Sequence, residues 1–139
     1  MKIKLLPLSL LSLLTACAGD PPQNLGVQNG RLAACPESPN CVSSFETDEQ
    51  HSIEPLAARL DQIEQVLLSL DEANIVDAGT NYLYTEFTSS LMGYVDDVEF
   101  LHDEAAGLTH VRSTSRVGYS DLGANRNRIE AIRSALKTD

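Results

Sequence analysis

Hydrophobic residues recur at intervals of three and four positions in two stretches of the chain, which predicts two amphipathic helices. The first has leucine or isoleucine at positions 56, 60, 63, 67 and 70, begins near Pro55 and ends between Ser69 and Glu72. The second runs from Asp121 or Leu122 to Leu136, with Ser120 or Asp121 as its N-cap. Its apolar stripe consists of Leu122, Ile129, Ile132 and Leu136.

Between these helices the apolar period shortens to two, which is typical of β-strands. Four strands are predicted, over residues 73–77, 82–90, 95–102 and 108–115. Residues 103–107 end in Gly107 and resemble a hairpin turn. With a four-residue loop, Phe100 faces Val111 on one face of the sheet and Glu99 faces Arg112 on the other.

The order of elements predicts an α+β fold, because short consecutive strands favour an antiparallel meander that both helices cover. We therefore expect a two-layer sandwich of about four antiparallel strands, with the N-terminal and the C-terminal helix on one face. The length of 139 residues suits one domain. Residues 31–139 are predicted to form it.

The first residues have the pattern of an export signal. Lys2 and Lys4 precede an apolar run over residues 5–14, which is shorter than the roughly 20 residues that span a bilayer. Leu14-Thr15-Ala16-Cys17 resembles the lipobox of bacterial lipoprotein precursors. That resemblance implies a signal peptide over residues 1–16, a diacylglycerol on the Cys17 sulfur and a further acyl chain, such as palmitate, on its amino group.

Location and attachment follow from that resemblance. Ala18, rather than aspartate, favours the outer membrane under the sorting rules of enterobacteria. We expect a protein held by its lipid on the periplasmic side of the cell envelope, with residues 17–30 as a flexible tether because they lack an apolar period. An ordinary secretory signal and a cytosolic protein remain alternatives.

Charge excludes one class of partner. The chain has 20 acidic and 10 basic side chains, a net charge of −10. Without residues 1–16, which contain two lysines and no acids, the balance becomes 8 − 20 = −12. Such a surface repels phosphate groups, so we expect no nucleic-acid partner and no attachment to membranes through basic residues.

Cys35 and Cys41 lie six positions apart in a loop that two prolines stiffen. In an oxidising compartment this spacing favours a disulfide. A thiol redox pair, a metal site with His51 and free thiols are the alternatives. Redox pairs usually have a tighter spacing, and no fourth metal ligand is evident.

Two separated motifs resemble a known family. The first is Cys-Pro-x-Ser-Pro-Asn-Cys-Val at residues 35–42, and the second comprises residues 94–100 and 112–128. Together they closely resemble domain-of-unknown-function family 1499 over residues 31–137. The family occurs in bacteria, lipoproteins included, and in plastid-bearing lineages. The resemblance implies no established activity, cofactor or catalytic residue.

Arginines are concentrated where the last strand leads into the last helix. Five of the eight basic residues after residue 16 are Arg112, Arg116, Arg126, Arg128 and Arg133. Guanidinium groups beside a helix N-terminus can bind an anion. The predicted anion-binding residues are Arg112, Arg116, Tyr119, Ser120, Asn125 and Arg126. The alternative is a structural ion-pair network with Asp96, Asp97, Glu99, Asp121 and Glu130.

The sequence predicts no catalytic residue, no metal site and no cofactor. His102 and His110 flank the hairpin as exposed polar residues, and no serine lies in a nucleophile-elbow motif. The main hypothesis is a lipid-anchored, non-catalytic binding module for an envelope protein or a small anionic ligand. A small envelope hydrolase or transferase that uses the arginine-rich turn is one alternative, and a purely structural lipoprotein is another. The oligomeric state stays open.

Overall fold

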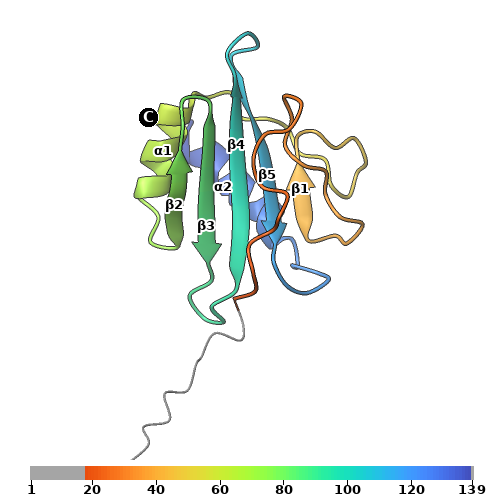
Figure 1. The fold of residues 1–139 in the computed structure, drawn as a ribbon. Coiled ribbons are helices and arrows are strands. Elements are labelled where there is room, and N and C mark those ends of the chain that lie inside the picture. Colours follow the sequence, from red (N-terminus) through yellow and green to blue (C-terminus); the bar gives the residue numbers. More distant parts are fainter. Residues whose placement is uncertain (1–17, 139) are drawn as a thin grey trace, which may run out of the picture.

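The computed structural model describes residues 18–138 and shows a five-stranded antiparallel sheet in the order β1-β5-β4-β3-β2 (Figure 1). The elements, in chain order, are β1 Cys41–Ser43, α1 Leu60–Leu68, β2 Ala73–Ala78, β3 Tyr82–Thr88, β4 Val95–Asp103, β5 Leu108–Ser115 and α2 Ala124–Ala135. The prediction of a mixed α+β fold with an antiparallel meander is therefore confirmed.

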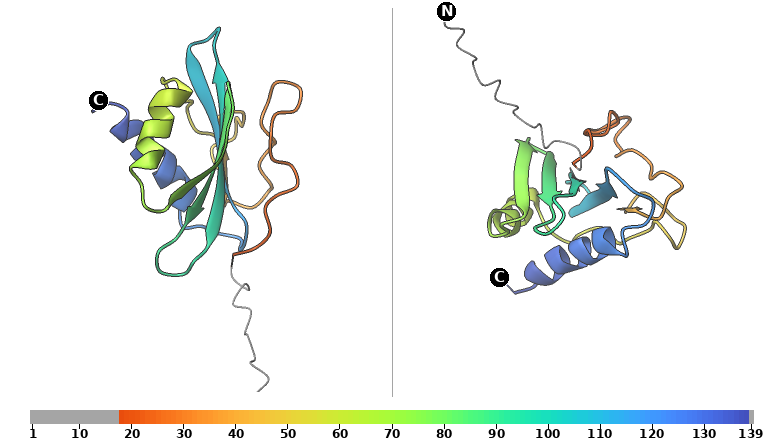
Figure 2. Two further views of the ribbon diagram at one scale, coloured as in Figure 1. Left: turned by 60° about the vertical axis from the view of Figure 1, so that its left-hand side comes forward. Right: turned by 90° about the horizontal axis from the view of Figure 1, so that it is seen from below.

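Both helices lie on the same face of the sheet (Figure 2). Alternation along the strands points Leu83, Phe87 and Phe100 at the helices, where they are buried. Ile63 of α1 and Ile129 of α2 complete this core from the other side. The apolar stripes of the helices and the period of two in the strands thus meet in a single hydrophobic layer.

The hairpin between β4 and β5 has the predicted register. Phe100 pairs with Val111, and Glu99 pairs with Arg112. The turn closes at Gly107, whose φ of 68° suits a residue without a Cβ. The first pair lies in the core, and the second lies on the face that the helices leave uncovered.

Three details differ from the sequence prediction. The sheet has a fifth strand, β1, which is only three residues long and pairs with β5 at one edge. Helix α1 begins at Leu60 rather than near Pro55, because Leu56 exchanges two backbone hydrogen bonds of 2.8 Å with Thr109. Helix α2 begins at Ala124, with Gly123 rather than Ser120 or Asp121 as its N-cap, so Leu122 lies before the helix and is 93% exposed, and the buried position expected for it belongs to Asn125.

The N-terminal segment, here residues 18–34, runs along the second face of the sheet, opposite the helices (Figure 2). The Gly26 N–H donates a 2.7 Å hydrogen bond to Glu99, and Gly19 O accepts one of 3.5 Å from Arg116. This placement differs from the flexible tether expected over residues 17–30. The segment lacks an apolar period because the surface that it covers is polar.

The predicted signal peptide and Cys17 lie outside the described residues. Within residues 18–138, no helix is both long enough and apolar enough to cross a membrane.

Candidate anion-binding site

The second face of the sheet has a buried layer of charged side chains. Glu99 is fully buried and Arg112 is 3% exposed, and their Oε2 and Nη1 atoms lie 3.1 Å apart. The other oxygen of Glu99 accepts hydrogen bonds from Gly26 N–H and from the Tyr82 hydroxyl, at 2.7 and 2.8 Å. Burial, with the neighbouring Glu99 carboxylate, raises the pKa of Tyr82, so this hydroxyl remains a donor.

A second cluster lies beside the first and centres on Arg116. Its guanidinium binds both oxygens of Asp97, at 2.9 and 2.8 Å, and one oxygen of Glu86 at 2.6 Å. The Tyr84 hydroxyl donates to the same Asp97 carboxylate. The hydrogen bond to Asp97 raises the pKa of Arg116 further above its ordinary value, so this side chain stays charged at all relevant pH values.

Arg112 differs from Arg116 in that one of its donors has no partner. Its buried Nε–H has no hydrogen-bond acceptor among the described residues. A cleft of about 340 Å³ between the N-terminal segment and β5 is lined by Asn24, Arg112, Thr114 and Arg116, among others. A buried donor without an acceptor costs about 1–3 kcal/mol, and Arg112 carries such a donor beside this cleft.

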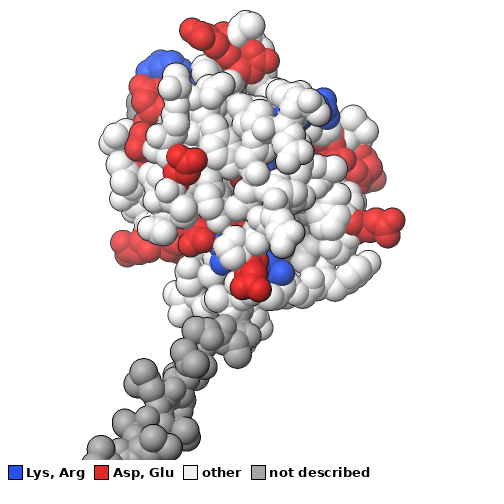
Figure 3. Space-filling view, in the orientation of Figure 1, with Lys and Arg blue, Asp and Glu red and all other residues white. Residues whose placement is uncertain are grey.

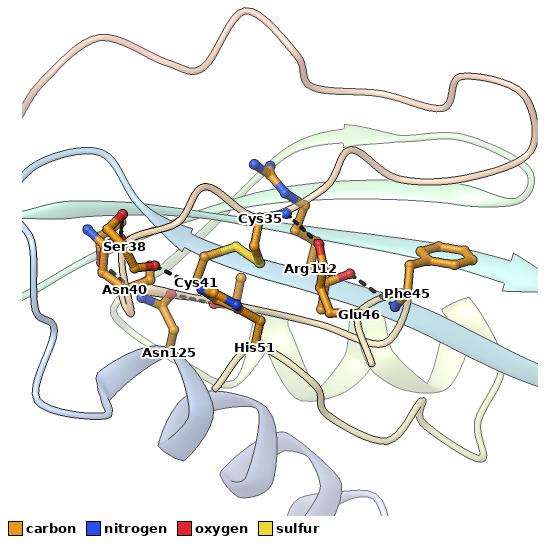
Figure 4. The surroundings of a disulfide bond; sticks show 12 residues. Cys35, Ser38, Asn40, Cys41, Phe45, Glu46, His51, Arg112 and Asn125 are labelled. Carbon is orange, nitrogen blue, oxygen red and sulfur yellow. Dashed lines mark hydrogen bonds between the residues drawn. A yellow bond between two sulfur atoms is a disulfide. The ribbon is translucent and has the colours of Figure 1, made fainter. Parts of the chain in front are cut away.

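The six predicted anion-binding residues do not come together. Arg112 and Arg116 lie on the second face, whereas Asn125 and Arg126 belong to α2 on the helix-covered face; Figure 4 shows Arg112 and Asn125 on opposite sides of β5. Tyr119 is 72% exposed, and Ser120 is exposed in the loop before α2. Only the two arginines of β5 and its end therefore share a cleft.

Asn125 and Arg126 have protein partners of their own. Asn125 is fully buried, accepts a 2.6 Å hydrogen bond from the Ser113 hydroxyl and donates to Ser115 Oγ at 2.8 Å. Arg126 donates to the backbone carbonyls of Ser52 and Gln50, at 2.8 and 3.1 Å. These contacts attach α2 to the strands and to the loop that precedes α1.

The ion-pair network that was the alternative to an anion site is largely present. Arg128 lies 2.6 Å from Asp96 and covers the ring of Phe87, while Arg133 pairs with Glu130 at 3.0 Å. Arg133 also donates to two backbone carbonyls before α1. Arg128 thus holds α2 against the sheet, and Arg133 holds it against the segment before α1.

A disulfide joins Cys35 to Cys41, as the spacing favoured, with 5.7 Å between the Cα atoms. It connects the end of the N-terminal segment to β1 and lies beside Arg112 (Figure 4). His51, the ligand considered for a metal site with these cysteines, instead contacts Asp48 through Nδ1 at 2.9 Å and Ser38 O through Nε2 at 3.1 Å. In the described part of the chain, no three metal-ligating side chains gather closely enough to hold an ion.

Sequence reasoning missed one polar pair, Ser44 and His110. The Ser44 hydroxyl lies 3.0 Å from Nδ1 of His110, whose ring stacks on Phe45 at 4.2 Å between centroids. The same hydroxyl accepts a 2.9 Å hydrogen bond from Val111 N–H, so it continues the β1–β5 ladder beyond Ser43. Burial lowers the pKa of His110, which keeps the imidazole neutral at pH 7. The pair therefore reinforces the sheet edge, and nothing but the structure itself reveals it.

Fold and site together define a small, disulfide-containing α+β domain with a covered, charged sheet face. Residues 31–136 match the model of the family described as "Protein of unknown function (DUF1499)", and the chain belongs to that family. Comparisons with curated proteins and with solved structures give no match.

Proposed function

We propose that the chain is a lipid-anchored protein of the bacterial cell envelope, held through Cys17 on the periplasmic side of a membrane. The lipobox-like residues 14–17 supply the attachment point, and the Cys35–Cys41 disulfide suits the oxidising compartment that an exported domain enters. The −12 charge of residues 17–139 leaves the lipid as the means of attachment. Ala18 favours the outer membrane as the destination.

We infer that the domain is a binding module for a small ligand with one anionic group. The observation that carries this proposal is the buried Arg112, with an Nε–H that has no described acceptor, in the wall of the cleft. Two arginines on this face meet the carboxylates of Glu86, Asp97 and Glu99, and Asp20 also lines the cleft, for a local charge of 2 − 4 = −2. That balance favours a monoanion such as a carboxylate over a phosphate dianion.

Thermal melting of the Cys17→Ser protein tests this binding. A ligand at 100 times its Kd adds about 2.7 kcal/mol, or roughly 10 °C for a domain of this size. We expect short-chain carboxylates to raise the Tm at matched ionic strength, and Arg112→Lys to abolish the rise because lysine has no Nε–H fork. Arg126→Lys, on the opposite face, is the matched control and should retain the rise. If neither millimolar carboxylate nor millimolar phosphate changes the Tm of the Cys17→Ser protein without further substitutions, the binding site is excluded.

A purely structural lipoprotein is the second candidate. Its support is that Arg116, Arg128 and Arg133 each already have a carboxylate partner. The same titration separates the two, because a structural domain has no ligand-dependent Tm.

A further inference from the structure

Large hydrophobic side chains are exposed mainly in two loops. The described residues include nine such side chains, and six of them lie in the β3–β4 loop, residues 89–94, or the β5–α2 loop, residues 116–123. These six are Leu91, Met92, Tyr94, Val117, Tyr119 and Leu122. Leu91 and Leu122 are 90% and 93% exposed, so neither contributes to the core. Clustered exposed apolar residues of this kind mark an interaction surface.

Both loops lie at the end of the sheet where the described chain begins. Thr88 pairs with Val95, and Asp96 with Ser115, so the β3–β4 loop starts and ends at the same end of the strands at which the β5–α2 loop starts. A Cβ on Gly19 would lie 3.0 Å from atoms of both Arg116 and Val117. Figure 1 shows the entering chain between the two loops.

The attachment point is therefore close to this end by covalent geometry alone. Two residues span at most about 7 Å, so any lipid on Cys17 is joined within that distance of Gly19. Gly19 lies against Arg116 and Val117, directly after β5, so little of the slack that a flexible tether would provide remains from residue 19 onward.

The two loops themselves carry little charge, although Asp20, Asp71 and Glu72 are exposed carboxylates that flank this end of the sheet. The β3–β4 loop has no charged residue, and Asp121, the one carboxylate of the β5–α2 loop, accepts hydrogen bonds from Gly123 and Asn125 N–H groups. Asp103 and Glu104 lie at the β4–β5 hairpin, at the far end of the sheet. In Figure 3 the lower end of the domain is mostly white but includes a red side chain between two blue patches, and further red side chains lie at the opposite end and on the flanks.

Leu122 adds an independent observation. It has a φ of 52°, a left-handed backbone conformation that is rare for a bulky side chain. A strained residue that exposes its whole side chain gains nothing within the isolated domain. In an apolar environment the same conformation presents the leucine outward from the loop.

We propose that this end of the domain lies on the bilayer, with Leu91, Met92, Tyr119 and Leu122 at the boundary of headgroups and acyl chains around the lipid of Cys17. The inference rests on the lipid anchor proposed above and adds the orientation of the domain to it. Apolar side chains at an interface enter by about 5–10 Å, and tyrosine is suited to the headgroup level. The acidic hairpin then faces away from the membrane.

Single tryptophans test this orientation, because the natural chain has none. Leu91→Trp and Leu122→Trp place a fluorophore in each loop, and Ala105→Trp, in the exposed turn of the β4–β5 hairpin, is the matched control. The full chain is expressed with its own leader, purified in mild detergent and reconstituted into phosphatidylcholine vesicles with or without brominated acyl chains. Flotation of the wild-type protein with these vesicles is measured alongside.

We expect emission at positions 91 and 122 to shift to shorter wavelength and to be quenched by bromine about twofold more than at position 105. Wild-type protein that fails to float overturns the lipid anchor, and the orientation with it. Wild-type protein that floats while all three tryptophans are equally unquenched overturns the orientation alone. A blue shift without bromine quenching indicates burial against protein and also overturns it.

Discussion

The buried pair of Glu99 and Arg112 provides the sharpest energetic test of the charged layer. Arg112→Met removes the cation and leaves the fully buried Glu99 with hydrogen bonds from Tyr82 and Gly26 only. Breaking a buried ion pair from one side typically costs about 3–5 kcal/mol. Because those two donors still stabilise the carboxylate, we expect a loss near 3 kcal/mol, or roughly 10 °C in Tm.

The double variant Glu99→Gln/Arg112→Met should recover much of that loss. Glutamine can still accept from Tyr82 and Gly26 through its carbonyl oxygen, and no unpaired charge remains in the layer. Urea unfolding of the two single variants and the double variant, in the Cys17→Ser background with the disulfide intact, gives the coupling energy. We expect about 2–3 kcal/mol. Additive single effects, with coupling below about 0.5 kcal/mol, would refute the reasoning.

An exposed pair gives the control for that cycle. Arg59 and Asp61 lie 2.9 Å apart, yet each side chain is 66% exposed. Water and salt screen such a pair, so the corresponding cycle should show no measurable coupling. A large coupling there would mean that the measurement does not report burial.

Three further predictions concern the helix cap, the disulfide and the N-terminal segment. Burial alone would raise the pKa of Asp121, but hydrogen bonds from Asn125 and Gly123 outweigh it and lower the pKa. The Asp121 carboxylate therefore stabilises the fold fully above the pKa of the unfolded chain, near 3.9. This contribution is lost as the pH falls through the lower pKa of the folded state. Asp121→Asn should cost about 1 kcal/mol at pH 7, and less below pH 4, in unfolding titrations. Replacing both disulfide cysteines with alanine should cost about 2–2.5 kcal/mol in the same assay, with no loss arguing against closure of the loop. Gly19→Ala should speed amide hydrogen exchange at Gly26, because a Cβ at position 19 would lie only 3.0 Å from atoms of Arg116 and Val117. Gly30→Ala, with a similar φ and open space around it, should not.

The strands and their register follow from local patterns, which explains why the sequence was sufficient for them. Only one register places Phe100 opposite Val111 and Glu99 opposite Arg112, so packing and charge agree on it. Strand β1 has three residues, too few to show a period, and its pairing partner is about 70 positions away along the chain. Because β1 is so short and its partner strand is so distant in sequence, no local pattern predicts it.

The N-terminal segment has the composition of a linker because its partners are polar. The hydrogen bonds to Glu99 and Arg116 require backbone groups of the segment, which every sequence supplies, so no side-chain pattern marks them. A search for apolar periodicity detects segments that cover hydrophobic layers and misses one that covers a charged layer.

The predicted anion site includes residues of α2 and of the preceding loop that are close to Arg112 and Arg116 in sequence but not in space. Arg112 was predicted opposite Glu99, on the face without helices, and that placement already separates it from any residue of α2. The sheet thickness lies between Arg112 and Arg126. What the sequence could not indicate is that Arg112 keeps an unpaired Nε–H, which depends on side-chain geometry.

Attachment to the membrane depends on lipid at the sulfur of Cys17, and intact-mass analysis of the natural protein tests for that lipid directly. We predict a mass equal to the chain from residue 17 with a diacylglycerol and an amide-linked acyl chain added, and a Cys17→Ser protein that no longer sediments with membranes. An unmodified mass, or a serine variant that remains with the membranes, would contradict the lipid anchor.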